Sequence, residues 1–103
     1  MIALIENNRP AIEALCRRYH VLRLEVFGSA ATGDFDPARS DVDFLVEFEP
    51  ETNLGPWLSV YFDLKRDLEA MFGCNVDLVM PAAMKNRYFI REVDQSRQLL
   101  YGA

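Results

Sequence analysis

The sequence has few of the features that mark secreted, membrane-spanning or polynucleotide-binding proteins. Its 103 residues include two cysteines, one tryptophan and one histidine. No apolar run approaches the roughly 18 residues that a membrane span needs. The first ten residues lack both the leading positive charge and the long apolar stretch of a signal peptide. We therefore expect a cytoplasmic protein with no membrane segment.

The two cysteines are also poor candidates for a disulfide or a metal site. Cys16 and Cys74 lie far apart and follow no metal-ligand spacing. Both stand inside apolar patterns, which favours free thiols in a reducing compartment over a disulfide.

Positive charge is scarce, with 11 Lys and Arg residues against 16 Asp and Glu residues and a net charge of −5. Proteins that hold polynucleotides usually cluster basic residues to neutralise several phosphates. We therefore expect no tight nucleic-acid binding. An acidic excess instead fits a site that collects divalent cations.

The length and the hydrophobic pattern predict one domain over residues 1–103 with one modest core. Apolar periodicity predicts helices at about 9–19, 57–72 and 83–93, and strands at 21–27, 41–48, 75–80 and 99–101. This order predicts an α/β (α+β) fold in which helices cover a small mixed β-sheet.

Two of the expected strands carry aspartates where strands usually avoid them. Val42, Phe44 and Val46 share one face of the strand at 41–48, so Asp41 and Asp43 point to the other. Asp77 likewise faces away from its apolar neighbours in the strand at 75–80. If these strands pair, the three carboxylates form a ligand set suited to Mg²⁺. Like charges this close repel, so a cation is expected among them.

Gly28 and Ser29 follow the strand at 21–27. A glycine lets the backbone approach a phosphate closely, and a serine adds a hydroxyl donor. A Gly-Ser pair alone is more often a plain turn, and an Asp-x-Asp pair alone is more often a solvated strand end. The order of all three features is what favours a nucleotide site.

That order resembles the minimal nucleotidyltransferases of the DNA polymerase beta superfamily. The resemblance rests on Phe27-Gly28-Ser29, the stretch from Ser40 to Phe48, and Val76-Asp77-Leu78-Val79. It implies a polymerase-beta-like fold and an antitoxin that transfers AMP from ATP to a tyrosine hydroxyl of a HEPN ribonuclease toxin. Gly28 and Ser29 would bind the triphosphate. Asp41, Asp43 and Asp77 would bind two Mg²⁺ ions, and Asp77 would also activate the incoming hydroxyl.

The chain departs from the family pattern at two points. Eleven residues separate Ser29 from Asp41, where ten is the commonest spacing, and Thr32 stands where many relatives have arginine. Arg39 or the pair Lys65-Arg66 are the basic residues that could compensate.

Two other functions stay open: a non-catalytic module that neutralises its partner by occlusion, and nucleotidyl transfer to a small molecule. Self-association is also left open. A neighbouring reading frame with an Arg-x-x-x-x-His ribonuclease motif would identify the partner class. Five aromatic residues are candidates for the partner interface, although most are expected in the core: Trp57, Tyr61, Phe62, Tyr88 and Phe89.

Overall fold

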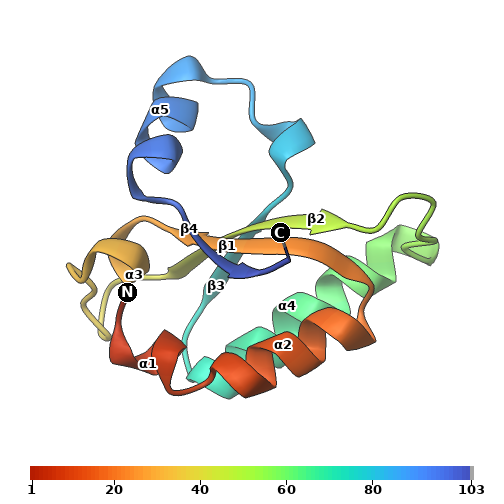
Figure 1. The fold of residues 1–103 in the computed structure, drawn as a ribbon, viewed down its shortest axis with the longest axis horizontal. Coiled ribbons are helices and arrows are strands. Elements are labelled where there is room, and N and C mark those ends of the chain that lie inside the picture. Colours follow the sequence, from red (N-terminus) through yellow and green to blue (C-terminus); the bar gives the residue numbers. More distant parts are fainter. Residues whose placement is uncertain (103) are drawn as a thin grey trace.

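A computed structural model describes residues 1–102 and contains a four-stranded mixed sheet with helices on both faces (Figure 1). The strands are β1 (Val21–Phe27), β2 (Val42–Phe48), β3 (Val76–Val79) and β4 (Gln98–Tyr101). Their order across the sheet is β3-β2-β1-β4. β1 is antiparallel to both β2 and β4, whereas β2 and β3 run parallel. The α/β prediction is therefore confirmed.

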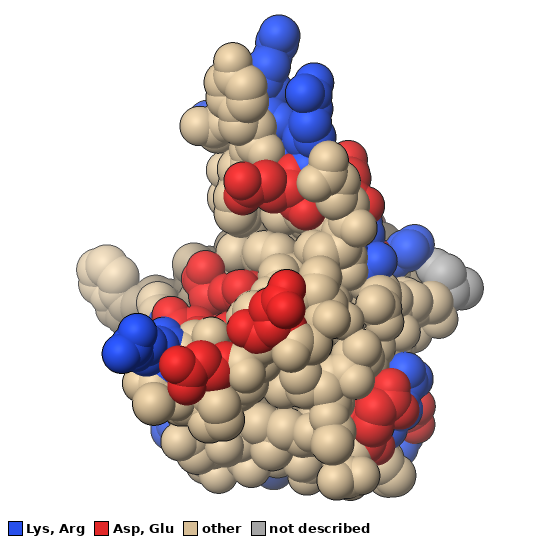
Figure 2. All heavy atoms as spheres, turned by 90° about the vertical axis from the view of Figure 1, so that its left-hand side faces the viewer, with Lys and Arg blue, Asp and Glu red and all other residues tan. Residues whose placement is uncertain are grey.

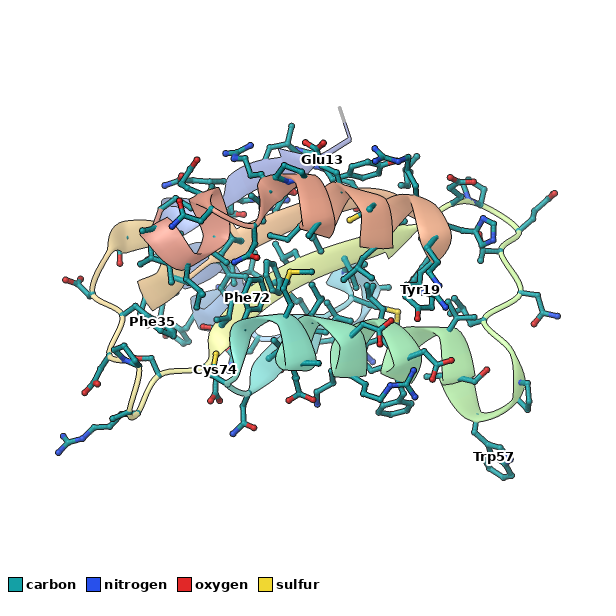
Figure 3. The ribbon with its side chains drawn as sticks, turned by 90° about the horizontal axis from the view of Figure 1, so that it is seen from below. Glu13, Tyr19, Phe35, Trp57, Phe72 and Cys74 are labelled. Atoms are coloured by element: carbon teal, nitrogen blue, oxygen red, sulfur yellow. The ribbon has the colours of Figure 1, made fainter. Side chains whose placement is uncertain are left out.

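The two longest amphipathic helices cover one face of this sheet. They are α2 (Arg9–Arg18) and α4 (Ser59–Phe72), and they lie side by side beneath the strands (Figure 3). α4 is also the crossover that parallel pairing of β2 and β3 requires. The main core lies between these helices and the sheet, where Phe44, Leu64 and Leu68 have no exposed surface.

A shorter helix, α5 (Arg87–Ser96), lies over the opposite face and projects from the body of the molecule (Figure 1). Its Val93 packs with Phe27 and Leu45 in a second, smaller cluster of buried residues. The Phe27 and Phe89 rings meet edge to face, with 5.9 Å between their centroids. The packing of α5 therefore buries Leu45, although this residue shares a face of β2 with Asp43.

Several short helices complete the fold. They are α1 (Ala3–Glu6), α3 (Ser29–Thr32), and the 3₁₀ segments η1 (Pro56–Leu58) and η2 (Pro81–Ala83). Sequence periodicity missed α1 and α3, because one helical turn is too short to show a period. Among residues 1–102, no helix has the length and apolar character to cross a membrane.

Two expected helix boundaries were wrong. The last helix begins at Arg87 instead of about residue 83, because the Asn86 side chain accepts hydrogen bonds from the amides of Tyr88 and Phe89 and so caps it there. α4 begins at Ser59 instead of residue 57, because Trp57 and Leu58 both have a φ of 56°. Gly73, with a φ of 68°, ends α4 as expected.

The expected faces of β1 also needed one correction. Leu24 and Val26 are buried as predicted, but Leu22 is 47% exposed. The pairing of β1 with β2 shifts register between Val21 and Arg23, so a bulge at Leu22 takes this residue out of the alternation. Both cysteines are free, with Cys16 buried, as the sequence predicted.

Candidate functional site

The parallel pairing of β2 and β3 brings two of the predicted acidic residues face to face. Asp43 lies directly across from Asp77 in the register, and Val42 lies across from Val76. Adjacent strands are about 4.8 Å apart, so the two carboxylates start from neighbouring positions. Val42, Phe44, Val76 and Leu78 are buried on the core side, which leaves both aspartates on the opposite face. Asp41 immediately precedes β2. We call Asp41, Asp43 and Asp77 the acidic group.

The electrostatics of the acidic group indicate that its carboxylates affect one another. The pKa of Asp43 is raised from 3.8 to about 6, first by burial and then by the charges of Asp77 and Asp41. The same charges also affect neighbouring side chains. Burial is the main reason why the pKa values of Tyr61 and Cys74 are raised, and the charges of Asp77 and Asp41, respectively, are the next largest cause. This is a region of strong negative potential, which a bound cation would relieve.

Within residues 1–102, no three His, Cys, Asp or Glu side chains are already gathered closely enough to hold one metal ion. Carboxylates without a cation repel one another, so a preassembled cage is not expected of them. What fits Mg²⁺ here is the donor set: three carboxylates, one of them half-buried with a raised pKa. Figure 2 shows acidic side chains on the flank of the molecule beneath the α5 arm, and basic side chains at the outer end of that arm.

Gly28 brings the predicted phosphate turn against the acidic group. It follows Phe27, which pairs with Asp43 in the sheet, and it has a φ of 69°. A Cβ atom at this position would lie 2.7 Å from Asp43 Oδ2. Only glycine therefore permits both the backbone conformation and the close approach. Ser29 is the first residue of α3 and is half-buried.

The structure also shows residues at this turn that the sequence did not single out. The Gly28 amide donates a hydrogen bond to Ser96 Oγ at 2.9 Å. Glu25, 4% exposed, accepts two hydrogen bonds from the Arg97 guanidinium, each 2.7 Å long. The Arg97 hydrogen bond is the main reason why the pKa of the Glu25 carboxyl is lowered. The one available signal was a charged residue in the otherwise apolar end of β1.

Of the three basic residues that could replace the missing arginine, Arg39 and Arg66 form ion pairs with other residues, and Lys65 lies beside Arg66 on α4. Arg39 forms an ion pair with Asp36 at 3.9 Å. Arg66 pairs with Asp63 and Asp67 on α4, which covers the other face of the sheet. Neither contact provides a cation at Thr32, which is exposed at the end of α3.

Two pockets of about 480 and 520 Å³ are lined by residues outside the acidic group. The smaller one is mostly apolar and lies between the N-terminal segment, the loop after α3 and the end of α4. It is lined by Ile2, Leu4, Phe35, Pro37, Phe72, Gly73 and Cys74. Asp41 and Asp77 are exposed and Asp43 is half-buried, so solvent reaches the acidic group.

The aromatic residues divide between the core and the surface. Trp57 is 94% exposed, Tyr88 72% and Phe62 53%, so the expectation of a core position was wrong for these three. Tyr61 and Phe89 are partly buried, as expected. Figure 3 shows the Trp57 side chain pointing away from the body of the molecule.

Comparison with known proteins identifies the family of this chain. The model of the nucleotidyltransferase domain family matches residues 9–100. The chain belongs to the nucleotidyltransferase domain family. It is 39% identical over 82 residues to the protein adenylyltransferase MntA of Thermococcus cleftensis, covering 77% of this chain and 78% of that protein. A Methanocaldococcus jannaschii protein, provisionally named a protein adenylyltransferase, is 36% identical over 81 residues, which are 79% of this chain and 78% of that one.

Solved structures confirm the fold of this nucleotidyltransferase. A structure provisionally described as a minimal nucleotidyltransferase has a TM-score of 0.73 and 30% identity, and the match covers 94% of this chain and 95% of that one. The MNT antitoxin complex with the tri-AMPylated HEPN toxin of Shewanella oneidensis has a TM-score of 0.64 at 19% identity, covering 95% and 72% of the two chains. The resemblance to minimal nucleotidyltransferases is therefore confirmed, and the chain is an enzyme of the nucleotidyltransferase class.

Proposed function

We propose that this nucleotidyltransferase transfers AMP from ATP to a hydroxyl group, that of a tyrosine, on a HEPN-type toxin, and thereby acts as an antitoxin. The observation that carries the proposal is the facing of Asp43 and Asp77 beside Gly28, in a chain whose curated relatives are named protein adenylyltransferases. Paired carboxylates next to a glycine turn suit a reaction in which a triphosphate and a metal meet.

In this proposal each residue has a defined task. Gly28 and Ser29 bind the triphosphate, and Asp41, Asp43 and Asp77 hold Mg²⁺. Bound Mg²⁺ would supply the positive charge that stabilises the attacking and leaving oxygens of an in-line displacement. The acceptor oxygen forms a bond with the α-phosphorus, the bond from that phosphorus to the β-phosphate oxygen breaks, and pyrophosphate leaves. The exposed carboxylate of Asp77 takes the hydroxyl proton.

A protein acceptor is favoured by the open position of the acidic group. The pockets described above do not enclose it, so a small acceptor would find few walls there to hold it. Exposed aromatic residues are enriched where proteins bind proteins, and Trp57, Phe62 and Tyr88 are such residues. The similar fold found in complex with an AMPylated HEPN toxin supports the same partner class.

The proposal is tested by incubating the chain with Mg²⁺, ATP labelled at the α-phosphate, and a HEPN-type protein with an Arg-x-x-x-x-His motif. We expect label on that protein and release of unlabelled pyrophosphate. Asp43→Asn should abolish labelling, whereas Asp34→Asn, at an exposed loop residue, should not. Replacing the labelled tyrosine of the partner by phenylalanine should remove the label.

Three results would redirect the proposal. Neutralisation of the partner without label would favour occlusion by a non-catalytic module. Equal labelling by the wild type and by Asp43→Asn would remove this residue from the metal site. Label on a small molecule alone would favour the third function.

A further inference from the structure

Three consecutive residues at the junction of α5 and β4 each contact the segment that contains the proposed phosphate turn. Ser96 Oγ accepts from the Gly28 amide, Arg97 binds Glu25 at the end of β1, and Gln98 Nε2 donates to the Ala31 carbonyl at 3.2 Å. These contacts join positions 67 to 72 residues apart in the sequence. We call residues 96–98 the clamp.

The middle contact fixes the clamp to the sheet. The Arg97 Nε and Nη2 atoms donate to the two oxygens of Glu25, and Nη1 donates to Asp94 Oδ1 at 2.8 Å. A bidentate pair sets both the distance and the angle of the guanidinium. Because the Glu25 carboxylate is almost wholly buried, it has little access to water as an alternative partner. The backbone on either side of Arg97 is therefore held in one place relative to β1.

The first contact acts on the backbone that the nucleotide is proposed to meet. With a φ of 69° and a ψ of −148°, Gly28 has a conformation available only to glycine, so its peptide units have few local restraints. The turn also approaches Asp43 closely. A rotation of the Gly28 peptide would change both the direction of the turn and its spacing from the acidic group. The Ser96 hydroxyl opposes that rotation by accepting the Gly28 amide hydrogen.

We propose that Ser96 is a positioning residue for nucleotide binding, which acts through the Gly28 amide and is held in place by the pairing of Arg97 with Glu25. This inference rests on the proposed function, because it concerns the same phosphate turn. It predicts that the Ser96 hydroxyl contributes to ground-state binding of the nucleotide more than to the rate of transfer.

The test compares Ser96→Ala with Ser96→Thr, which keeps a hydroxyl group, and with Ser59→Ala as a matched control. Ser59 Oγ donates to the Leu54 carbonyl at 3.4 Å in the connection between β2 and α4. Calorimetry measures the affinity for AMP-PNP in the presence of Mg²⁺. The labelling assay gives KM and kcat, and circular dichroism gives Tm.

We expect Ser96→Ala to raise both the Kd for AMP-PNP and the KM for ATP about three- to tenfold, the effect of losing one neutral hydrogen bond. The kcat should stay within about twofold, since Ser96 contacts neither the acceptor nor the acidic group in our proposal. Ser96→Thr should stay within about twofold of the wild-type affinity. Ser59→Ala should match the wild type in both affinity and KM.

Three results would overturn the inference. A lower Tm with unchanged affinity in Ser96→Ala would make the residue merely structural. Tighter binding would mean that Ser96 occupies an amide that the phosphates need. A fall in kcat with unchanged KM would place its effect in the transfer step. If the wild type itself binds no AMP-PNP, the proposed function fails, and that outcome is distinct from these three.

Discussion

Replacing Asp43 by asparagine tests the electrostatics of the acidic group without any substrate. Burial and the charges of Asp77 and Asp41 raise the pKa of Asp43 from 3.8 to about 6. Because this pKa is higher in the folded chain than in the unfolded one, protonated Asp43 favours folding. The resulting stabilisation is fully present below about pH 4 and is lost as the pH rises through about 6. At neutral pH the ionised carboxylate therefore destabilises the fold.

The size of this effect follows from the two pKa values. A rise from 3.8 to about 6 corresponds to about 3 kcal/mol at 1.36 kcal/mol per pKa unit. Because Asp43 is only half-buried, solvent screening reduces this free energy. Asparagine removes the charge but still has an amide to bury, so we expect Asp43→Asn to recover about half of it. In a domain of this length, 1 kcal/mol shifts Tm by roughly 4–8 °C. The variant should therefore melt about 6 °C above the wild type.

Thermal melting followed by circular dichroism in EDTA at pH 7.5 and pH 4.5 measures this difference. The gain should be large at pH 7.5 and should shrink at pH 4.5, where wild-type Asp43 is protonated. Mg²⁺ added at pH 7.5 should reduce the difference in Tm between Asp43→Asn and the wild type, because only the wild type keeps all three carboxylates for the cation. Asp34→Asn is the matched control and should change Tm little at either pH. Equal melting of Asp43→Asn and the wild type at pH 7.5, or a gap independent of pH, would refute the reasoning.

Four further variants, in three experiments, test other parts of the structure. Gly28→Ala and Gly33→Ala form a pair, because both glycines have positive φ but only the Cβ at Gly28 would meet another atom within 4 Å. Urea unfolding should show that Gly33→Ala lowers the free energy of unfolding by about 1–2 kcal/mol and that Gly28→Ala lowers it clearly more. Equal decreases would contradict the close approach of Gly28 to Asp43. Glu25→Gln should lower the free energy of unfolding by about 2 kcal/mol at pH 7. Because Arg97 lowers the pKa of the Glu25 carboxyl, the stability of this variant should fall less steeply with decreasing pH than that of the wild type. Parallel plots of stability against pH would contradict the role of this ion pair. Trp57→Gly should leave the isolated chain as stable as the wild type or up to about 1 kcal/mol more stable, because glycine adopts a φ of 56° without the strain of a tryptophan. The same variant should capture less of the partner in a pull-down, because the Trp57 side chain is exposed. Undiminished capture would exclude this side chain from the interface.

The sequence predicted the parts of the site that depend on local periodicity. Two-residue alternation was enough to place Asp43 and Asp77 opposite their apolar neighbours, and the observed register now sets them across from each other. The glycine after β1 was equally visible, since its position at a strand end does not depend on distant contacts. The roles of these residues remain our proposal.

The parts that sequence reasoning missed depend on contacts between distant segments. Ser96 and Gly28 are 68 residues apart, and Arg97 and Glu25 are 72 apart, so no local pattern connects either pair. The exposure of Leu22 follows from a bulge in strand pairing, which alternation along a single strand cannot show. The expected start of the last helix was too early because a single cap at Asn86 sets that boundary.

The placement of α5 explains how so short a chain can keep two strands paired although each carries an aspartate facing the other. The main core holds the strands from one face through α2 and α4, whatever the charge on the other face. On that other face, Val93 of α5 packs with Phe27, which precedes Gly28, and with Leu45, which lies two residues after Asp43. At the end of the same helix, Ser96 Oγ accepts a hydrogen bond from the amide of Gly28 in the phosphate turn. The strand ends that carry the acidic group are therefore held from both faces, and their side chains can repel without separating the strands. In our proposal, a bound cation would relieve this repulsion, and that relief would favour metal binding at the acidic group.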